Sequence, residues 1–309
     1  MNSETITATA SGTWKLGDLT VNRVGFGTMR LTQDGAALDP DAVPSDRRRA
    51  MAVLRRAVEL GVNHLDTASF YFSRLRSANE LVNSALAPYP DDLVITTKVG
   101  PGRDPHGAWT DAATPAQLRG QVEENLRQLG RDHLDVVNYR RQRAGSIAEH
   151  FGALAELRDA GLIRHLGLSN VGAEHLAEAQ AIAPVVCVQN RYGLGLATPE
   201  ADALLHSCGE QGIAFVPFYA IAGTAGEKGT TAAQAAQDSE VRAIAEAHGI
   251  SAAELRLAWS LHQGPHVLAI PGTGNPAHLE ANIAAGALKL PADDLTRLDA
   301  VHVAAAAGA

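Results

Sequence analysis

The chain has 309 residues, of which 46% are hydrophobic and 19% are charged, and its formal net charge at pH 7 is −8. This composition is typical of a globular protein, and the length suffices for one large α/β barrel or for two ordinary domains. Because phosphate binding needs clustered Lys and Arg, the net negative charge argues against nucleic acid as a partner.

The cysteines and the chain ends exclude further classes. Two cysteines, Cys187 and Cys208, are too few for a disulfide framework. No apolar run approaches the ~18 residues of a membrane span, and the N-terminus does not resemble a signal peptide. We therefore expect a cytoplasmic protein with no membrane partner, in which a single domain over residues 13–303 lies between flexible ends at 1–12 and 304–309.

The first element predicted along the chain is a short hairpin over residues 13–22, with its turn at Gly17-Asp18. Glycine and aspartate are residues that tight turns favour. The hairpin precedes the first long apolar run, and we expect it to close the lower end of the fold.

After the hairpin, a strand-like run alternates with a helix-like segment eight times. Most runs are continuously apolar, which is typical of a parallel sheet buried on both faces. The predicted strands are residues 23–27, 63–66, 93–98, 134–139, 165–168, 185–189, 213–218 and 267–271. The predicted helices lie near residues 47–60, 76–87, 115–129, 146–160, 173–181, 199–211, 251–263 and 276–285.

Capping residues mark the ends of these helices. The residues expected before helix starts are Ser45, Thr114, Thr198 and Ser251, the last with Glu254 in a capping-box pattern. The glycines expected after helix ends are Gly61, Gly130, Gly161 and Gly212.

Eight consecutive strand–helix units predict an α/β fold, a closed (β/α)8 TIM barrel with the hairpin as its N-terminal plug. A doubly wound open sheet is the alternative. Against it, no Gly-x-Gly-x-x-Gly segment follows an early strand, and no linker divides the chain. Two segments, 33–45 and 222–238, are longer than ordinary loops. The second follows the seventh strand, at the face where barrel enzymes carry their function.

Polar or aromatic residues end six of the predicted strands. They are Asp66, Lys98, Tyr139-Arg140, Ser169-Asn170, Gln189-Asn190 and Phe218-Tyr219. Alone, a Lys in such a position is usually a solvated tip, and an Asp is often a helix cap. Because the carboxyl ends of all the strands meet on one face of a barrel, the six positions together predict an active site there.

Six ordered segments between about Thr13 and Asp299 resemble the aldo-keto reductase family. They are residues 25–30, residues 64–68 with Tyr71, residues 97–99, 167–170 and 188–190, and residues 270–282. The resemblance implies a barrel that reduces a small-molecule aldehyde or ketone with NADPH. It implies no metal site.

The resemblance also assigns catalytic roles. Tyr71 matches the family's general acid, although a free tyrosine titrates only near pH ~10. Lys98 matches the residue that lowers the tyrosine pKa, and Asp66 the residue that holds this lysine. Arg140 stands where the family has a histidine that donates to the substrate carbonyl. Without the other two, Tyr71 could equally be a packed aromatic side chain beside Phe70 and Phe72.

Cofactor contacts carry over in the same way. The residues that match the nicotinamide carboxamide site are Ser169, Asn170 and Gln189, while Phe218 matches the ring that stacks on the nicotinamide. The residues that match the adenosine side are Gly272, Thr273, His278 and Asn282. In the first-strand segment, Gly27, Thr28 and Met29 are further residues expected to bind the cofactor. The segment 222–238 is placed to fold over the pyrophosphate.

The chain departs from the family pattern in places that bear on specificity. Residues 72–76 follow Tyr71 where the family usually has glycine, and this bulkier segment would change the substrate mouth. Gly272 and His278 stand where some members bind the 2′-phosphate with Lys and Arg, which weakens the expected preference for NADPH. The run 135–140 resembles a bacterial branch that includes pyridoxal reductases, and so hints at an aromatic aldehyde.

Two other functions stay open beside the reductase. A nicotinamide-binding sensor or regulatory subunit without catalysis is compatible with the lost histidine, whereas Asp66, Tyr71 and Lys98 favour an enzyme. A barrel lyase or isomerase would bind a phosphorylated substrate and no nicotinamide. The sequence leaves the physiological substrate, the direction of reaction and the oligomeric state open.

Overall fold

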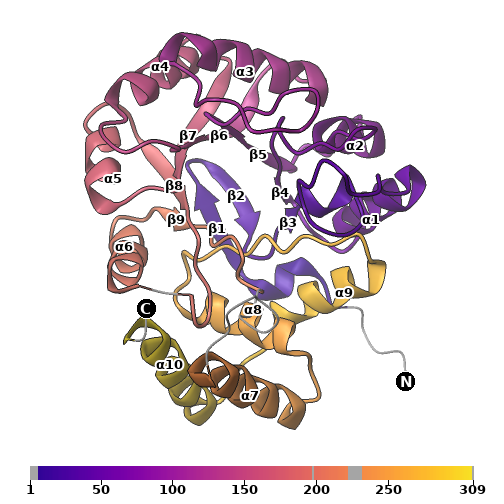
Figure 1. Cartoon of the computed structure of the whole chain (residues 1–309), viewed down its shortest axis with the longest axis vertical. Helices are drawn as coiled ribbons and strands as arrows, with labels where there is room; N and C mark the ends of the chain where they lie inside the picture. The colour runs from indigo at the N-terminus through magenta and orange to yellow at the C-terminus, as the bar shows by residue number, and fades with distance from the viewer. Residues whose placement is uncertain (1–5, 197, 222–231, 308–309) are drawn as a thin grey trace.

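The structure is a computed structural model that describes residues 6–196, 198–221 and 232–307. A seven-stranded parallel sheet curls into a barrel, and its strands follow one another in chain order (Figure 1). The strands are β3 (Phe26–Gly27), β4 (His64–Asp66), β5 (Val94–Val99), β6 (Leu134–Arg140), β7 (Ile163–Ser169), β8 (Val185–Gln189) and β9 (Ala214–Phe215). Every residue of β5 is buried, including the polar Thr96, Thr97 and Lys98.

The eighth predicted strand closes the barrel through single bridges. In the segment 267–271, Val267 bridges to Phe215 on one side and Ala269 bridges to Val24 on the other. The Ala269 N–H donates to the carbonyl of Arg23 at 2.8 Å, and the Ala269 carbonyl accepts from the Gly25 N–H at 2.8 Å. The barrel prediction is therefore confirmed, with a first strand and an eighth strand less regular than the sequence indicates.

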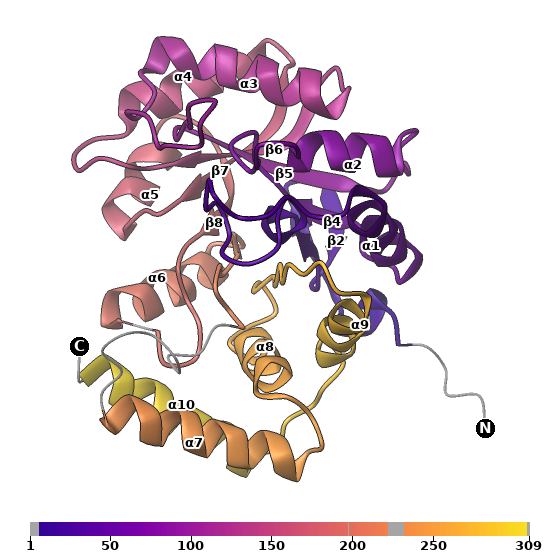
Figure 2. The same cartoon turned by 45° about the vertical axis from the view of Figure 1, so that its right-hand side comes forward.

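Helices surround the sheet, as Figures 1 and 2 show. Those predicted from the sequence are α1 (Arg47–Glu59), α2 (Ala78–Leu86), α3 (Pro115–Leu129), α4 (Ala148–Asp159), α5 (Ala173–Gln180), α6 (Pro199–Glu210), α8 (Ala252–His262) and α9 (Pro276–Ala285). A 3-10 helix, η2 (Met29–Leu31), follows β3. In the described ranges, no helix is long and apolar enough to cross a membrane.

The predicted helix caps are present with one exception. Ser251 and Glu254 form the predicted capping box, in which the Glu254 N–H donates to the Ser251 hydroxyl at 3.2 Å. The prediction that Ser45 caps α1 is wrong. Asp46 accepts from the Arg49 N–H at 2.7 Å instead, while the Ser45 hydroxyl donates to the carbonyl of Leu31. A carboxylate one residue closer to the helix takes the capping role because it reaches the free amides.

The predicted hairpin is formed by β1 (Thr13–Leu16) and β2 (Leu19–Asn22). Its side chains Leu16 and Val21 belong to a buried cluster with Val94, Val136 and Leu268 from the barrel interior. Since these residues lie near the starts of their strands, the hairpin covers the end of the barrel opposite to the strand carboxyl ends.

Three predicted loop or tail segments contain helices. In the N-terminal tail, Ala8–Ser11 forms the 3-10 helix η1, and the buried Ala8 donates its N–H to the carbonyl of Leu60 at 2.8 Å. Helix α10 (Ala292–Ala307) runs into the predicted flexible end. Helix α7 (Ala232–Ala247) covers the second part of the segment 222–238, whose residues 222–231 lie outside the described ranges.

The two unpredicted helices lie side by side beyond α8 (Figures 1 and 2). One buried and one partly buried polar contact link them to α8. Arg256 of α8 pairs with Asp238 of α7, and the Trp259 Nε1–H donates to Asp299 of α10 at 2.9 Å. The apolar faces of α7 and α10 thus complete the cover of the barrel on this side.

Candidate active site

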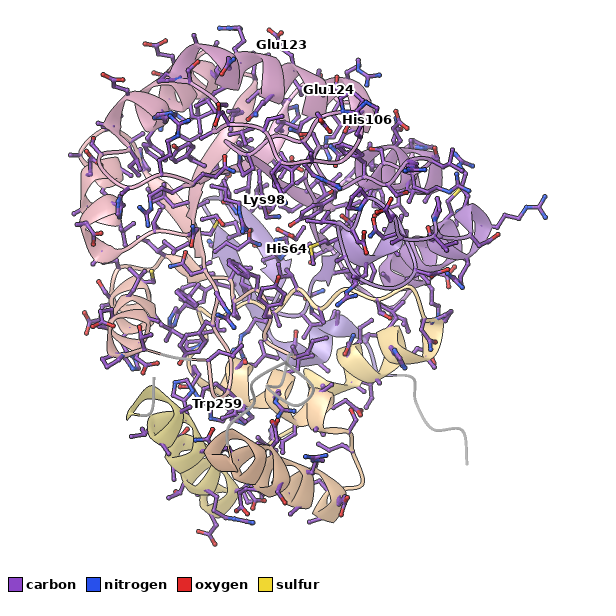
Figure 3. All side chains as sticks on the ribbon, in the orientation of Figure 1. His64, Lys98, His106, Glu123, Glu124 and Trp259 are labelled. Carbon is purple, nitrogen blue, oxygen red and sulfur yellow. The ribbon has the colours of Figure 1, made fainter. Side chains whose placement is uncertain are left out.

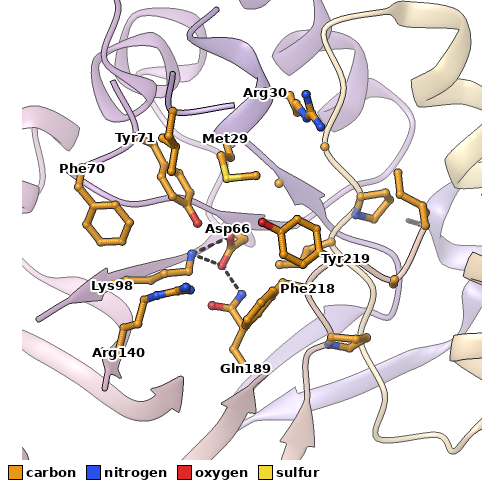
Figure 4. Close-up of a pocket in the computed structure, with 18 of the residues that line it drawn as sticks. Met29, Arg30, Asp66, Phe70, Tyr71, Lys98, Arg140, Gln189, Phe218 and Tyr219 are labelled. Atoms are coloured by element: carbon orange, nitrogen blue, oxygen red, sulfur yellow. Dashed lines mark hydrogen bonds and ion pairs between the residues drawn. The ribbon is translucent and has the colours of Figure 1, made fainter. Parts of the chain in front are cut away.

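A cavity of about 460 Å³ opens at the carboxyl ends of the strands. All four predicted catalytic residues line it, although they come from different elements: Asp66, Tyr71, Lys98 and Arg140. Figure 4 shows Asp66, Tyr71 and Lys98 grouped closely, with Arg140 beside Lys98. The sequence prediction that polar groups at the strand ends meet on one rim describes this arrangement.

A buried ion pair lies at the centre of this group. The Lys98 ammonium is 2.7 Å from each carboxylate oxygen of Asp66 and 3.0 Å from the carbonyl of Thr67, to which it also donates. The two side chains are 2% and 5% exposed. Figure 3 places Lys98 well inside the barrel, with His106, Glu123 and Glu124 farther out. A charge so far from water requires a bonded partner, and Asp66 supplies it.

Other buried groups fix the Asp66 carboxylate and its backbone. The Gln189 amide nitrogen donates to Asp66 Oδ1 at 2.7 Å. The Thr28 hydroxyl is within reach of the Asp66 carbonyl at 3.1 Å and of the Thr67 hydroxyl at 2.9 Å. Thr28 therefore holds the backbone of Asp66 in place, although it does not line the cavity.

Tyr71 faces the ion pair from a short segment after β4. Its N–H donates to the Ala68 carbonyl at 3.0 Å, and its own carbonyl accepts from the Ala78 N–H at 2.8 Å. The Lys98 ammonium lies 4.9 Å from the centre of the Tyr71 ring. These contacts hold the phenol at the wall of the cavity.

Burial raises the pKa of Tyr71, although the positive charge of Lys98 opposes this effect. Lys98 thus acts on the phenol in the expected direction, but the net pKa of Tyr71 is raised, because the loss of water around the phenolate outweighs the attraction. Burial likewise works against the Lys98 ammonium, yet the combined attraction of Asp66 and Tyr71 raises the pKa of Lys98. At neutral pH the site thus holds a protonated phenol beside an ammonium.

Arg140 ends β6 and turns into the cavity. Its guanidinium carbon lies 5.2 Å from the centre of the Phe218 ring. Within the described part of the chain, no carboxylate forms an ion pair with it, whereas the neighbouring Arg143 pairs with Asp111 at 3.5 Å. Arg140 therefore presents an uncompensated cation to whatever enters the cavity.

The predicted cofactor residues fall into two groups. Those that line the cavity are Gly27, Met29, Gln189, Phe218 and Gly272. Those that do not line it are Thr28, Ser169, Asn170, Thr273, His278 and Asn282. In the second group, the Asn170 amide donates to the Arg141 carbonyl at 2.9 Å, and the Thr273 hydroxyl accepts from the Asn275 N–H at 3.0 Å. Both side chains stabilise loops at the rim.

Two features of this rim suit a nicotinamide dinucleotide. The Ser169 hydroxyl is buried and has no hydrogen-bond partner among the described residues, which is costly unless a ligand supplies one. A Cβ atom on Gly27 would lie 2.6 Å from the Ile270 carbonyl, so only glycine lets the first strand approach the segment before α9. At the start of α9, by contrast, Pro276 has no N–H, and the Ala277 N–H already donates to Asn275 Oδ1 at 2.9 Å.

Sequence reasoning missed much of the cavity wall. The further lining residues include one cation, Arg30, and several apolar or aromatic side chains: Leu38, Phe70 and Trp109. Trp109 is 52% exposed. Leu38 and Trp109 lie on loops without periodicity, and no sequence pattern marks them.

Comparisons with known proteins agree with this geometry. The model of the Aldo/keto reductase family matches residues 23–303. A pyridoxine 4-dehydrogenase from Escherichia coli is 40% identical over 94% of this chain and 99% of its own length. A methylglyoxal reductase from the same organism is 31% identical over 93% of both chains. The crystal structure of an aldo-keto reductase from Klebsiella pneumoniae in complex with NADPH has a TM-score of 0.73 at 27% identity, over 92% of both chains.

Proposed function

Because the chain belongs to the aldo/keto reductase family, whose members are oxidoreductases of carbonyl and alcohol groups, we propose that it reduces small aldehydes or ketones with NADPH. The observation that carries the proposal is the contact of Tyr71 with the buried Lys98–Asp66 pair inside an open cavity. A proton donor in this position serves catalysis, which favours an enzyme over a sensor without catalysis.

The nicotinamide, when bound, supplies the hydride. We assign Ser169 and Gln189 to its carboxamide, since one has an unpartnered hydroxyl and the other lines the cavity. Phe218 offers a ring face on the same wall. We assign Gly272, which lines the cavity, and the neighbouring Thr273 to the phosphate. The Klebsiella relative was crystallised with NADPH, which supports this choice of cofactor.

The proton of the new alcohol comes from Tyr71 in this proposal. A carbonyl that accepts hydride becomes an alkoxide, and the phenol donates its proton to that oxygen. The Lys98 ammonium then stabilises the phenolate that remains, and Asp66 holds the ammonium in position. Arg140 donates N–H groups toward the same oxygen and stabilises its negative charge.

For the substrate we propose an aromatic aldehyde with an ionised oxygen beside the carbonyl. Aromatic side chains form much of the wall, and Arg140 offers a charge that such an oxygen can pair with. The relative named pyridoxine 4-dehydrogenase supports a pyridoxal-like compound. Because another relative is named methylglyoxal reductase, we choose methylglyoxal as the small aliphatic compound for comparison.

A cofactor-oxidation screen tests the proposal. The purified chain is mixed with NADPH and, in turn, with pyridoxal, benzaldehyde, methylglyoxal and an aliphatic ketone, and the loss of NADPH absorbance is followed. We expect turnover with at least the aromatic aldehydes, and the highest kcat/KM with pyridoxal. Tight binding of NADPH without oxidation by any carbonyl compound would instead support the sensor function.

A further inference from the structure

Arg103 lies next to the cavity, and its guanidinium joins three separate segments of the chain. Nε donates to the Gly107 carbonyl at 2.8 Å, and Nη2 donates to the Leu38 carbonyl at 2.9 Å. Nη1 donates to the carbonyls of Phe72 at 2.7 Å and Phe70 at 3.3 Å. One side chain thus satisfies four backbone acceptors with its planar group of five donors.

Aromatic rings also surround this guanidinium. Its central carbon lies 4.7 Å from the centre of the Phe72 ring and 5.8 Å from that of Trp109. No carboxylate in the described ranges forms an ion pair with Arg103. Carbonyl dipoles and ring faces, together with the electrostatic attraction of Asp104, therefore balance its charge, an arrangement that lysine cannot reproduce.

The segments that Arg103 joins carry one wall of the cavity. The wall residues on them are Leu38, Phe70 and Trp109, of which the last two are in contact as tilted rings, 5.7 Å between ring centres. Leu38 adopts φ 62, a left-handed conformation that disfavours an L side chain. Such strain persists only where neighbouring contacts hold it, and the bond from Arg103 to the Leu38 carbonyl is one of them.

Tyr71 lies between two carbonyls that Arg103 binds, but it has its own backbone hydrogen bonds to Ala68 and Ala78. Loss of Arg103 should therefore displace the wall more than the acid. We infer that Arg103 is a positioning residue for substrate specificity: it sets the aromatic wall of the cavity against which a ring-bearing carbonyl substrate packs. This inference rests on the proposed reductase function and extends it to the choice of substrate.

The test compares Arg103→Gln with Arg74→Gln, a control that removes an exposed arginine close in sequence to Phe72, outside the cavity lining. Arg74 makes only a 3.5 Å ion pair with Asp41 and does not line the cavity. For Arg103→Gln we expect KM for benzaldehyde or pyridoxal to rise about tenfold, while kcat/KM for methylglyoxal changes less than about twofold. The KM of Arg103→Lys for the aromatic aldehydes should lie between those of wild type and Arg103→Gln. The KM of Arg74→Gln should equal that of wild type.

Equal losses for aromatic and aliphatic substrates, or no change for either, would overturn the inference, as would an Arg103→Lys variant with wild-type selectivity. A wild-type chain that oxidises no NADPH would overturn the proposed function instead. The wall can then still be tested through acrylamide quenching of tryptophan fluorescence, with Trp109→Phe identifying the contribution of Trp109. We expect Arg103→Gln to increase quenching of Trp109, and unchanged quenching would contradict the inference.

Discussion

The Lys98 ammonium binds both carboxylate oxygens of Asp66 at 2.7 Å, deep in the barrel and within reach of the cavity. The pair joins the carboxyl ends of two adjacent parallel strands, β4 and β5. It therefore contributes to the stability of the barrel and to the chemistry of the phenol beside it.

Replacing one member should reveal both contributions. Lys98→Met leaves a buried carboxylate without its cation, and we expect the free energy of unfolding to fall by about 3–5 kcal/mol. Reductase activity should fall by about 10²–10⁴-fold, because the phenolate formed in the reaction loses its partner. Denaturant unfolding and steady-state kinetics measure the two effects. Lys15→Met, which changes an exposed lysine, serves as the control. Unaltered stability together with full activity would show that the pair has neither role.

The protonation state of Tyr71 predicts opposite pH dependences for the two directions of reaction. Burial raises the pKa of Tyr71, so the phenol stays protonated through neutral pH. Reduction needs the protonated form. Its rate should therefore be level through neutral pH and fall only as the pH rises through this raised pKa, above the ordinary value of about 10. Alcohol oxidation needs the phenolate and should increase with pH.

Removing a positive charge near Tyr71 should also shift the pH profile in a defined direction. Lys98 and Arg140 both act to lower the Tyr71 pKa, and Arg140→Met should therefore move both limbs to higher pH. Profiles of kcat/KM against pH in each direction provide the measurement. A shift to lower pH, or a reductive rate that already declines near pH 7, would mean that a group other than Tyr71 governs the profile.

Arg140 should discriminate between anionic and neutral substrates. Arg140→Met removes the unpaired cation that faces the cavity while retaining a side chain of similar length. We expect kcat/KM to fall about tenfold or more for aldehydes with an adjacent anionic group, and much less for neutral aldehydes of equal size. Arg143→Met is the matched control, since Arg143 is exposed and pairs with Asp111. Equal effects on both substrate classes would remove Arg140 from the oxyanion and anion-binding roles.

Cofactor preference should be modest. The phosphate segment offers Gly272 and Thr273, and Gly272 and the exposed His278 stand where some family members bind the 2′-phosphate with Lys and Arg. We expect NADPH to bind about tenfold more tightly than NADH, equivalent to about 1.4 kcal/mol. Titration of cofactor fluorescence gives both dissociation constants, and His278→Arg should widen the difference. Equal affinities, or tighter binding of NADH, would argue against a 2′-phosphate site here.

The fold was predictable where apolar residues and helix caps recur in a regular pattern along the chain. Mostly apolar runs alternating with helix-like segments located the seven paired strands, and caps such as Ser251 with Glu254 located helix boundaries. The 222–238 segment was different, because its Gly, Thr and Ala content resembles a loop. Its later part nevertheless forms α7, since Asp238 can pair with Arg256 on α8. Such a distant partner leaves no local signal.

The site was predictable where its residues end strands of the barrel. Asp66, Lys98, Arg140 and Gln189 end strands, so their meeting follows from the barrel itself. Trp109 and Leu38 reach the cavity from loops, and Arg103 organises them through backbone carbonyls. Hydrogen bonds to carbonyls do not depend on residue type, and no motif marks them. The net direction of the Tyr71 pKa also required the structure, because burial outweighs the charge that the sequence shows.

The most direct test of the central claim is single-turnover reduction by Tyr71→Phe. The phenylalanine ring keeps the packing against Phe70 and the contact with Lys98, and it removes only the hydroxyl that donates the proton. We expect NADPH to bind as it does to wild type, while hydride transfer to an aromatic aldehyde slows by about 10²–10⁴-fold. If Tyr71→Phe transfers hydride at a rate close to that of wild type, Tyr71 is not the acid, and the proposed mechanism is wrong.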